Sequence, residues 1–429
     1  MKEHFTLLIY RVLLPCLFLI AFPGWILRML RRGGLGTALG ERIGVFTRAA
    51  EFEPSGAIHF HAVSVGETVL ALKLLREWQL AFPESRFVIA TGTATGHELA
   101  TRATIPGLRV TYSPLDFPWM IRSYLNRFEP ARVILIEGEV WPNFLRIAHQ
   151  RKLPVFLANA RVSPRSAKRF LKFAPLLRPF FSRLSGVCIQ ENEHRSLWLA
   201  LGISAENIHL TGSIKFDTQS ATPPPLREDF SAMLSTFGNG RPIVLAASTF
   251  PGEETLIASA IHAADLNALP VIVPRHAERR AEVFQALAHA GFQVTLRSSF
   301  TAPSLSEKQV FVIDSTGELA TWTTHADVVI IGKSFLSTGG QNPAEAILAR
   351  KPLILGPRME NFQPLARHLL TADAAIHAHT SEEISSAIRS ALDPSTAAIL
   401  TENASRIIFL HDGATKRHLQ VLQRSDKTA

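Results

Sequence analysis

Several short polar motifs in this 429-residue sequence directly follow apolar runs, and they hold residue types that bind anions or move protons. The first contains Ser64, Gly66 and Glu67, which follow the apolar run 58–63. Small residues at the start of a helix let backbone N–H groups approach an anion, and the helix dipole adds to the attraction. The same residues also fit an ordinary strand-to-helix turn with Ser64 as N-cap, so both interpretations stay open.

Two carboxylates, Glu137 and Glu139, follow the apolar run 133–136. Paired carboxylates at a strand end can serve as general acid and base, or they can position a hydroxyl group. The alternative is that they cap the helix begun by Trp141 and Pro142, because proline is favoured in the first turn of a helix.

In the second half of the sequence, Pro274, Arg275 and His276 follow the apolar run 271–273. Arginine is suited to bidentate contact with a phosphate group. A solvated helix start is the alternative interpretation of this short motif.

Another motif, which contains Gly317, Glu318 and Leu319, follows the apolar run 310–313. Ser315 precedes it, and the three-residue spacing from Ser315 to Glu318 fits a capping box. The motif therefore predicts a helix start at the end of a strand.

The clearest phosphate-binding signal is a glycine-rich loop after the apolar run 328–331. Its candidate ligand-binding positions are Gly332, Lys333, Ser334, Gly339, Gly340, Gln341, Asn342 and Glu345. Such a loop before a helix that begins near Asn342 is typical of a phosphate cradle. It is not a P-loop, because the G-x-x-x-x-G-K-[ST] frame is absent. Glu345 can face a ribose or complete a capping arrangement.

The sequence carries no recognisable metal-binding signature. His59 and His61 lie on one face of a predicted strand without a suitably spaced third ligand, so core packing is the better interpretation. No Asp-x-Asp pair follows a predicted strand, and no G-x-S-x-G nucleophile elbow occurs. We therefore expect no metal and no resident cofactor.

Residues 140–190 contain no Asp or Glu, and their cations are interleaved with phenylalanines. A charged helix face normally mixes signs, so this stretch favours an anionic partner. The cations are Arg146, Arg151, Lys152, Arg161, Arg165, Lys168, Arg169, Lys172, Arg178 and Arg183. Anionic lipid or a phosphorylated lipid substrate fits such a surface. Nucleic acid is the competing partner, but no recognisable nucleic-acid-binding module accompanies the stretch.

These motifs must be positioned by the elements between them, and from residue 57 onward apolar runs alternate with amphipathic stretches. Such runs are typical of buried parallel strands. They lie at residues 58–63, 86–90, 133–136, 155–157 and 187–189, and again at 243–246, 271–273, 310–313, 328–331 and 353–355. The pattern predicts two doubly wound, Rossmann-like α/β domains facing a cleft, with ligands at the carboxyl ends of the strands.

We predict five parts of the chain. They are an N-terminal membrane anchor (1–32), an N-terminal α/β domain (33–216), a linker (217–240), a C-terminal α/β domain (241–400) and a C-terminal helix (401–429) that can cross back to the first domain.

The N-terminal segment 5–30 is apolar except for Arg11 and Arg28. Its uncharged run 12–27 reaches about 24 Å as a helix, which is short of the ~30 Å hydrocarbon core. Pro15 and Pro23 also argue against one straight helix. No A-x-A-like cleavage site follows, so a retained anchor that spans the membrane or lies in its interface is favoured over a signal peptide. The arginines after it place the rest of the chain in the cytoplasm.

Composition excludes several classes of protein. Hydrophobic residues make up 47% of the chain, which excludes disorder over most of it. The two cysteines, Cys16 and Cys188, cannot form a disulfide framework, so a stapled secreted scaffold is excluded too. The net charge of +9 does not by itself select a function.

Taken in order, the motifs resemble those of the Kdo (3-deoxy-D-manno-octulosonic acid) transferases of lipopolysaccharide biosynthesis, over nearly the whole chain. In the first half they are Gly40-Glu41-Arg42-Ile43-Gly44, the segment 61–67, the segment 137–143, Ala158-Asn159-Ala160-Arg161 and the segment 212–217. In the second half they are Pro274-Arg275-His276, Gly317-Glu318-Leu319, the segment 339–345, Gly356-Pro357 and Asn361-Phe362.

The resemblance implies a GT-B glycosyltransferase that is inverting and metal-independent, at the cytoplasmic face of the bacterial inner membrane. It implies CMP-Kdo as the donor and the tetraacyl lipid A precursor, lipid IVA, as the acceptor. By motif, Glu41 would be the general base and Arg42 would keep it ionised. Arg275 and the glycine-rich loop would stabilise the leaving phosphate, and Glu345 would hold the ribose.

The remaining residues of the implied site fall into two groups. The donor side comprises Pro274, His276, Gly317, Glu318, Leu319, Lys333, Ser334, Gly339, Gly340 and Asn342. The acceptor and Kdo side comprises Ser64, Gly66, Glu67, Glu137, Glu139, Asn159, Arg161 and Lys215.

Three positions depart from the pattern that the resemblance leads us to expect. Lys333 stands in place of a second glycine, Gln341 in place of histidine, and Gly138 in place of a residue with a side chain. Lys333 could add a phosphate contact, whereas Gln341 puts in doubt any role that requires imidazole. Gly138 leaves the spacing from Glu137 to Glu139 intact.

Two other functions remain as alternatives. One is a GT-B transferase that uses a different nucleotide sugar on a lipid, and the other is a membrane-anchored binder of nucleotides or lipids without catalysis.

Overall fold

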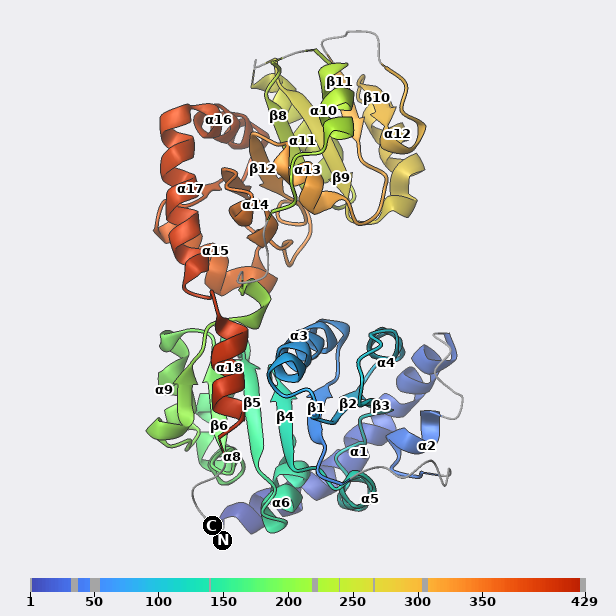
Figure 1. Cartoon of the computed structure of the whole chain (residues 1–429), viewed down its shortest axis with the longest axis vertical. Helices are drawn as coiled ribbons and strands as arrows, with labels where there is room; N and C mark the ends of the chain where they lie inside the picture. The colour runs from blue at the N-terminus through green and yellow to red at the C-terminus, as the bar shows by residue number, and fades with distance from the viewer. Residues whose placement is uncertain are drawn as a thin grey trace. The chain divides into compact units, whose positions relative to one another are not determined.

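The computed structural model describes residues 2–31, 38–46, 55–138, 140–217, 223–238, 240–264, 267–302 and 308–424. The chain divides into two compact units, which Figure 1 shows coloured along the sequence. Unit 1 comprises Met1–Asp217 and Gly413–Ala429, and unit 2 comprises Thr218–Asp412.

In unit 1 the described strands form a seven-stranded sheet in the order β3-β2-β1-β4-β5-β6-β7, with parallel pairing throughout. They are β1 (Ile58–Ala62), β2 (Phe87–Thr91), β3 (Leu108–Tyr112), β4 (Arg132–Ile136), β5 (Val155–Ala160), β6 (Gly186–Ile189) and β7 (Ile208–Leu210). The helices are α1 (Lys2–Arg31), α2 (Ala38–Arg42), α3 (Val65–Ala81), α4 (Ala94–Thr101), α5 (Pro118–Phe128), α6 (Pro142–Gln150), α7 (Pro164–Lys172), α8 (Ala174–Phe181), α9 (Arg195–Ala200) and α18 (Ala414–Leu422). Short 3-10 turns are η1 (Asn192–His194), η2 (Ala205–Asn207) and η3 (Ile214–Phe216).

In unit 2 the described strands form a second parallel sheet of seven, in the order β10-β11-β9-β8-β12-β13-β14. They are β8 (Ile243–Thr249), β9 (Leu269–Pro274), β10 (Gln293–Leu296), β11 (Gln309–Val312), β12 (Val328–Ile331), β13 (Leu353–Leu355) and β14 (Ile376–His377). The helices are α10 (Glu228–Ser235), α11 (Glu253–Ala263), α12 (Arg280–His289), α13 (Leu319–Thr324), α14 (Ala344–Leu348), α15 (Gln363–Thr371), α16 (Ser381–Leu392) and α17 (Pro394–Phe409). The 3-10 turns are η4 (Ala277–Arg279), η5 (Arg297–Ser299) and η6 (Glu360–Phe362).

The sheets have the doubly wound form that the apolar runs predict, and each run lies in a strand. The four strands that the apolar runs do not predict are β3, β7, β10 and β14. They are the outermost strands of the two sheets. Their side chains are only partly buried, so they lack the continuous apolar runs of strands buried on both faces.

Each face of the unit 1 sheet is covered by its own apolar cluster. On one face, Phe60 of β1 packs with Leu74 and Trp78 of α3. The C-terminal helix α18 joins this cluster through Leu419 and Leu422, so the end of the chain is part of unit 1. The other face packs α5, α6 and α8 against β4 and β5.

The C-terminal helix expected at residues 401–429 is not one helix, because α17 ends at Phe409 and α18 begins at Ala414. Gly413 separates them, with a φ of 71° that favours glycine. The Asp217 carboxylate accepts hydrogen bonds from Gly413 N at 2.9 Å and Thr415 N at 2.7 Å. One side chain therefore joins the two segments at which the chain enters and leaves unit 2.

Helix α1 packs side-on against unit 1. Leu7 is buried in its core, Tyr10 Oη donates to Asp116 Oδ2 at 2.9 Å, and the Phe18 ring packs on Phe117. Its outer side exposes apolar side chains, Ile20 at 79%. The helix continues through Pro15 and Pro23 without a break. A proline removes only one hydrogen bond, and in a long packed helix it more often produces a bend than an end.

Candidate functional site

In each sheet, the order of the strands marks where a ligand is expected. The chain order reverses between β1 and β4 in unit 1 and between β8 and β12 in unit 2, and open α/β sheets bind ligands at such switch points. Backbone strain is found at both places. Glu137 follows β4 with a φ of 62°, Ser248 lies at the end of β8 with 58°, and Lys333 follows β12 with 56°. Such strained conformations of non-glycine residues cluster at functional sites, although Thr104, Lys152 and Arg350 also adopt them away from the two switch points.

Glu41 lies on α2, and the end of the edge strand β3 fixes its carboxylate. Glu41 Oε2 accepts hydrogen bonds from Thr111 Oγ1 at 3.0 Å and from Tyr112 N at 3.1 Å. The other oxygen, Oε1, makes no hydrogen bond with any residue that the structure describes. Glu41 is half-buried, so a fixed carboxylate keeps one oxygen open to a ligand.

Arg42, next to Glu41, is buried and holds α2 to the sheet. Its Nη1 donates to the Gly92 carbonyl at 2.7 Å, and its guanidinium lies 3.9 Å from the centre of the Tyr112 ring. Burial lowers the pKa of Arg42, which Tyr112 and Glu41 partly oppose. An arginine remains charged despite such a shift, so Arg42 places a cation beside Glu41.

The 64–67 motif lies beside this helix. A Cβ atom at Gly92 would lie 2.6 Å from the Val63 carbonyl oxygen, so Gly92 brings the ends of β1 and β2 together. The N-cap interpretation of Ser64 is confirmed: its Oγ accepts from Glu67 N at 3.2 Å and donates to Glu67 Oε1 at 2.8 Å. Glu67 Oε2 accepts from Val63 N at 2.8 Å, so both Glu67 oxygens are bonded within the turn. Binding of substrate by this turn stays a prediction.

A second cluster in unit 1 gathers around Asn159, which lies one residue before the end of β5 in a left-handed conformation (φ 53°). Its side chain reaches Glu137 Oε1 at 3.5 Å and accepts from Ile214 N at 2.9 Å, and it thereby joins β4 to η3. Burial lowers the pKa of Lys215 to about 8; Arg161 adds to this shift and Glu137 opposes it. The sequence-predicted residues Glu137, Asn159, Arg161 and Lys215 are thus brought together. Glu139 lies outside the described residues.

The start of α6 is organised by a residue that sequence reasoning missed. Asp116, 1% exposed, accepts from Asn143 N at 2.9 Å and Phe144 N at 2.8 Å. Burial raises its pKa to about 7, against the hydrogen bonds from Asn143, Tyr10 and Phe144. The helix is therefore capped by Asp116 and not by Glu137, because Glu137 faces Asn159 instead. The only sequence signal was an aspartate before the proline that opens the next helix.

In unit 2, the structure brings Arg275 and Glu345 within electrostatic range. Burial raises the pKa of Glu345, and Arg275 opposes the shift. Arg275 follows β9, where its N–H donates to the Thr249 carbonyl at 3.0 Å. The His276 ring packs against Phe250, with 6.0 Å between the ring centres. A cation and a carboxylate therefore stand together at the carboxyl end of the sheet.

Glu253, which is fully buried at the start of α11, fixes the first part of the glycine-rich loop by hydrogen bonds. Its carboxylate accepts from Lys333 N at 2.6 Å, Phe335 N at 3.0 Å and Phe250 N at 2.9 Å. Lys333 Nζ lies 4.7 Å from the centre of the Phe250 ring. Sequence reasoning missed Glu253, whose signal was an acidic pair after Gly252 at a helix start.

The second half of the loop is fixed in the same way. Gly339 N donates to Glu360 Oε2 at 2.6 Å, and Gly340 packs against Met359 with a φ of 67°. The helix expected near Asn342 begins at Ala344, because Asn342 Oδ1 accepts from Ala344 N at 3.1 Å and so precedes the first turn.

Two predicted donor-side motifs are already bonded within the protein. Ser334 is fully buried; its hydroxyl donates to the Ile331 carbonyl and accepts from Gly356 N, which joins β12 to β13. The capping box of Ser315 is wrong: Ser315 bonds the Glu318 carboxylate, but α13 begins at Leu319 with Glu318 as its N-cap. Glu318 also lies within 4 Å of two arginines, Arg227 (3.7 Å) and Arg297 (3.6 Å).

His59 and His61 are core residues, as their pattern indicates. Burial lowers the pKa of His59 to about 3 and that of His61 to about 4, so both rings are neutral near pH 7. His59 bonds the Tyr124 hydroxyl at 3.1 Å and His61 Nε2 bonds the Ser113 hydroxyl at 2.7 Å.

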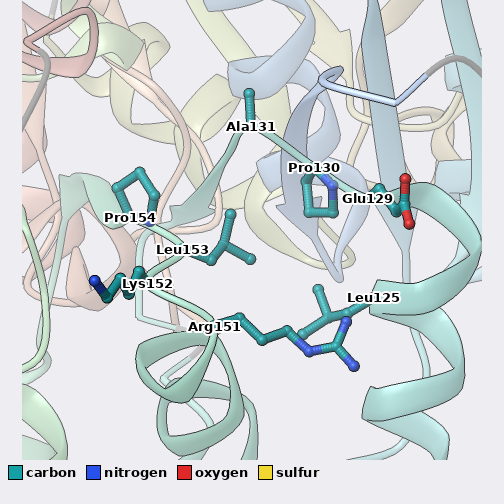
Figure 2. A pocket seen from close by; sticks show the side chains of 8 residues that line it. All are labelled: Leu125, Glu129, Pro130, Ala131, Arg151, Lys152, Leu153 and Pro154. Carbon is teal, nitrogen blue, oxygen red and sulfur yellow. The ribbon is translucent and has the colours of Figure 1, made fainter.

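One pocket of unit 1 lies away from these residues (Figure 2). Its lining includes Glu129, Pro130, Arg151 and Pro154, which precede β4 and β5. It therefore stands at the amino ends of the strands, opposite the edge at which Glu41 and Glu137 lie.

Comparisons with known proteins agree with this arrangement. The family described as 3-deoxy-D-manno-octulosonic-acid transferase matches residues 37–218. The 3-deoxy-D-manno-octulosonic acid transferase of Haemophilus influenzae is 32% identical over 390 residues, 90% of each chain. That of Bordetella pertussis is 32% identical over 411 residues, 93% of this chain and 95% of the relative.

Solved structures show the same fold at low identity. Anabaena Alr3699/HepE in complex with UDP-glucose gives a TM-score of 0.54 at 14% identity, over 85% of this chain and 98% of the other. The UDP-GlcNAc 2-epimerase from Neisseria meningitidis bound to UDP-GlcNAc gives a TM-score of 0.57 at 14% identity, over 86% of this chain and 100% of the other. Two doubly wound units of this kind are the GT-B architecture. With the relatives matched along nearly its whole length, the chain belongs to the 3-deoxy-D-manno-octulosonic acid (Kdo) transferase family of glycosyltransferases.

Proposed function

We propose that this chain transfers Kdo from CMP-Kdo to a hydroxyl of the tetraacyl lipid A precursor, with inversion at the anomeric carbon and without a metal ion. Membership of the Kdo transferase family supports the sugar. The observation that carries the chemistry is the Glu41 carboxylate, which Thr111 and Tyr112 fix through Oε2 while Oε1 stays open.

Glu41 is the general base of the proposed reaction. As the acceptor hydroxyl oxygen attacks the anomeric carbon of Kdo, its proton moves to Glu41 and a new C–O bond forms. The bond from the anomeric carbon to the phosphate oxygen breaks, and its electron pair leaves with CMP. Attack opposite the leaving group inverts the anomeric configuration, so one carboxylate is enough.

Unit 2 supports the departure of CMP. The phosphate gains charge as the bond to Kdo breaks, and fixed cations stabilise that charge without reorganisation. Arg275 and Lys333 supply cations at the carboxyl ends of β9 and β12, the two strands on either side of β8, and this is the charge that a divalent metal supplies in metal-dependent transferases. In this proposal Glu345, which lies within electrostatic range of Arg275, accepts hydrogen bonds from the ribose hydroxyls.

Unit 1 supports an acceptor that sits in a membrane. Helix α7 exposes Arg165, Lys168, Arg169 and Lys172, and the exposed apolar side chains of Leu171 and Phe173 lie at its end. Helix α7 contacts α8, and α8 contacts α1. Helix α1 also has an exposed apolar side. Residues 6–24 of α1 are long and apolar enough to span a membrane. Since the opposite side of α1 packs on unit 1, we propose that it lies in the anionic interface at the cytoplasmic face of the inner membrane.

Mass spectrometry of the lipid product tests the proposal. Purified enzyme is incubated with the lipid A precursor, CMP-Kdo generated in situ and EDTA. A gain of one or more Kdo units is expected, with loss of the product in Glu41→Gln and retention of CMP binding. Glu98→Gln is the matched control, because Glu98 is an exposed carboxylate of unit 1 that pairs only with Arg102 among the described residues.

Each contrary result has a distinct meaning. No gain by folded, CMP-binding enzyme overturns the donor and acceptor assignment in favour of another nucleotide sugar or of a binding protein. Product formation by Glu41→Gln at the wild-type rate overturns the base. Loss of product only when EDTA is present overturns the metal-independent reaction.

A further inference from the structure

The loop that follows β3, residues 113–117, contacts three elements that otherwise lie far apart in the sequence. Leu115 N donates to the Arg42 carbonyl at 3.2 Å, at the end of the helix that carries Glu41. The Asp116 carboxylate caps α6 through Asn143 N and Phe144 N. Asp116 and Phe117 also contact α1.

Asp116 contacts α1 through one hydrogen bond between its buried carboxylate and a phenol. Tyr10 Oη donates to Asp116 Oδ2 at 2.9 Å, and Asn143 N donates to the same oxygen at 2.9 Å. Because they share one acceptor, the seating of α1 and the start of α6 are linked through Asp116. Asn143 Nδ2 also donates to the Asp116 carbonyl at 2.8 Å, which adds a second link between the loop and the helix.

Helix α6 in turn follows the loop that carries Glu137, and the 113–117 loop follows the strand end that fixes Glu41. Thr111 and Tyr112, which bond the Glu41 carboxylate, directly precede the loop. A displacement of the 113–117 loop would therefore shift the carboxylates of both Glu41 and Glu137. Errors of about 1 Å at a reacting group can cost about a hundredfold in rate.

We propose that Asp116 is a positioning residue through which the seating of α1 on unit 1 sets the geometry of Glu41 and of the Glu137 loop. The inference rests on the proposed function, because it assigns Glu41 to the reaction. It gives the anchor helix a second role: besides holding the enzyme at the membrane, α1 completes the active site. Transfer is then fastest when the interface holds α1 in place.

Tyr10→Phe tests this, because it removes one hydroxyl and leaves Asp116 able to cap α6. The matched control is Tyr124→Phe, which removes another buried hydroxyl of unit 1, the one bonded to His59. Transfer is measured with the full chain on vesicles of phosphatidylethanolamine and phosphatidylglycerol. Binding to the vesicles is measured by flotation.

For Tyr10→Phe we expect kcat to fall about tenfold, with KM for CMP-Kdo and vesicle binding within about twofold of wild type. For Tyr124→Phe we expect kcat within about twofold of wild type. This should hold even if the thermal midpoint of Tyr124→Phe falls as far as that of Tyr10→Phe. A purely structural role for Tyr10 would lower the midpoint without this split between kcat and KM. Asp116→Asn, which turns an amide toward the N–H groups of α6, is expected to lower kcat further where it folds.

Equal values of kcat in Tyr10→Phe and wild type overturn the inference, as does an equal fall in both tyrosine variants. A change confined to vesicle binding reduces α1 to an anchor and overturns it too. A wild-type enzyme that transfers no Kdo contradicts the proposed function instead, so the two failures are distinct.

Discussion

The hydroxyl of Thr111 donates a 3.0 Å hydrogen bond to Glu41 Oε2, so the edge strand of the unit 1 sheet orients a carboxylate that belongs to a short separate helix. Tyr112 N bonds the same oxygen at 3.1 Å. Two donors on one oxygen restrict rotation of the carboxylate and direct the other oxygen away from the strand. This is the support that a general base needs, because its rate depends on alignment with the hydroxyl proton.

Replacement of Thr111 by valine tests that support. Valine keeps the shape and removes the donor, so Glu41 should lose its fixed orientation while its charge remains. We expect kcat for Kdo transfer to fall about ten- to a hundredfold, with KM for CMP-Kdo nearly unchanged. Steady-state kinetics on the lipid acceptor measures both values. Thr101→Val, which removes a hydroxyl bonded to a carbonyl of its own exposed helix, serves as the control. Similar losses in both variants would contradict the role of Thr111.

Lys215 should make the affinity for an anionic ligand depend on alkaline pH. Burial lowers its pKa to about 8, so the ammonium is lost as the pH rises through that value. At pH values above about 8 we expect an increase in KM for the anionic substrate that Lys215 contacts, which is the alkaline limb of the pH profile. This alkaline limb should disappear in Lys215→Arg because arginine stays charged. Stability should respond with the opposite sign. The folded state binds fewer protons than the unfolded chain between about pH 8 and 10.5, so this residue adds stability as pH rises through that window.

Kinetics of the two proteins over a series of pH values separates these effects from a general loss of fold. An alkaline limb that is the same in Lys215→Arg and wild type would assign it to another group. Thermal midpoints at the same pH values show whether the protein remains folded throughout.

Sequence reasoning located the strands that are buried on both faces, because continuous apolar runs are typical of such strands. It also placed Ser64 and Arg275 at strand ends, since polar residues after such runs must lie at the edge of the sheet. It could not find Thr111 or Asp116, which belong to a half-exposed edge strand and the loop after it. Their partners, Glu41 and Tyr10, lie 70 and 106 residues away. Spacing in one sequence carries no information about contacts at that range.

The same reasoning gave no role for the buried Glu253, because an acidic pair at a helix start is common on solvated surfaces. Its burial and three backbone donors became visible only when β8 and β12 were paired. The roles of Glu41, Glu137 and Glu345 in transfer came from the resemblance to the family. They stay predictions until the variants are measured.

Gly332 should be intolerant of a side chain. A Cβ atom there would lie 2.6 Å from the Ser248 carbonyl oxygen and 2.7 Å from Thr249 Cα, both backbone atoms at the end of β8. Gly332→Ala must therefore force β8 and β12 apart at the switch point, and we expect about 1–3 kcal/mol of lost stability. Calorimetry should show a lower midpoint for unit 2. Gly66→Ala, where the nearest atom is Ser64 Oγ at 4.0 Å, should leave stability unchanged or slightly higher. Equal midpoints in both variants would contradict the close approach.

Lys333 should lower the thermal stability of the enzyme and at the same time favour binding of the donor. Its φ of 56° is left-handed, which costs a residue with a side chain about 1 kcal/mol relative to glycine. Lys333→Gly is therefore expected to raise the thermal midpoint of the enzyme and, by removing a cation beside the glycine-rich loop, to raise KM for CMP-Kdo about tenfold. Arg350→Gly is the matched control, because Arg350 is an exposed cation of unit 2 with a φ of 51°. It should gain similar stability with no change in KM. A Lys333→Gly enzyme that gains stability and keeps its KM would show that the lysine makes no phosphate contact. The strained backbone at Lys333 would then belong only to the turn after β12 and have no part in donor binding.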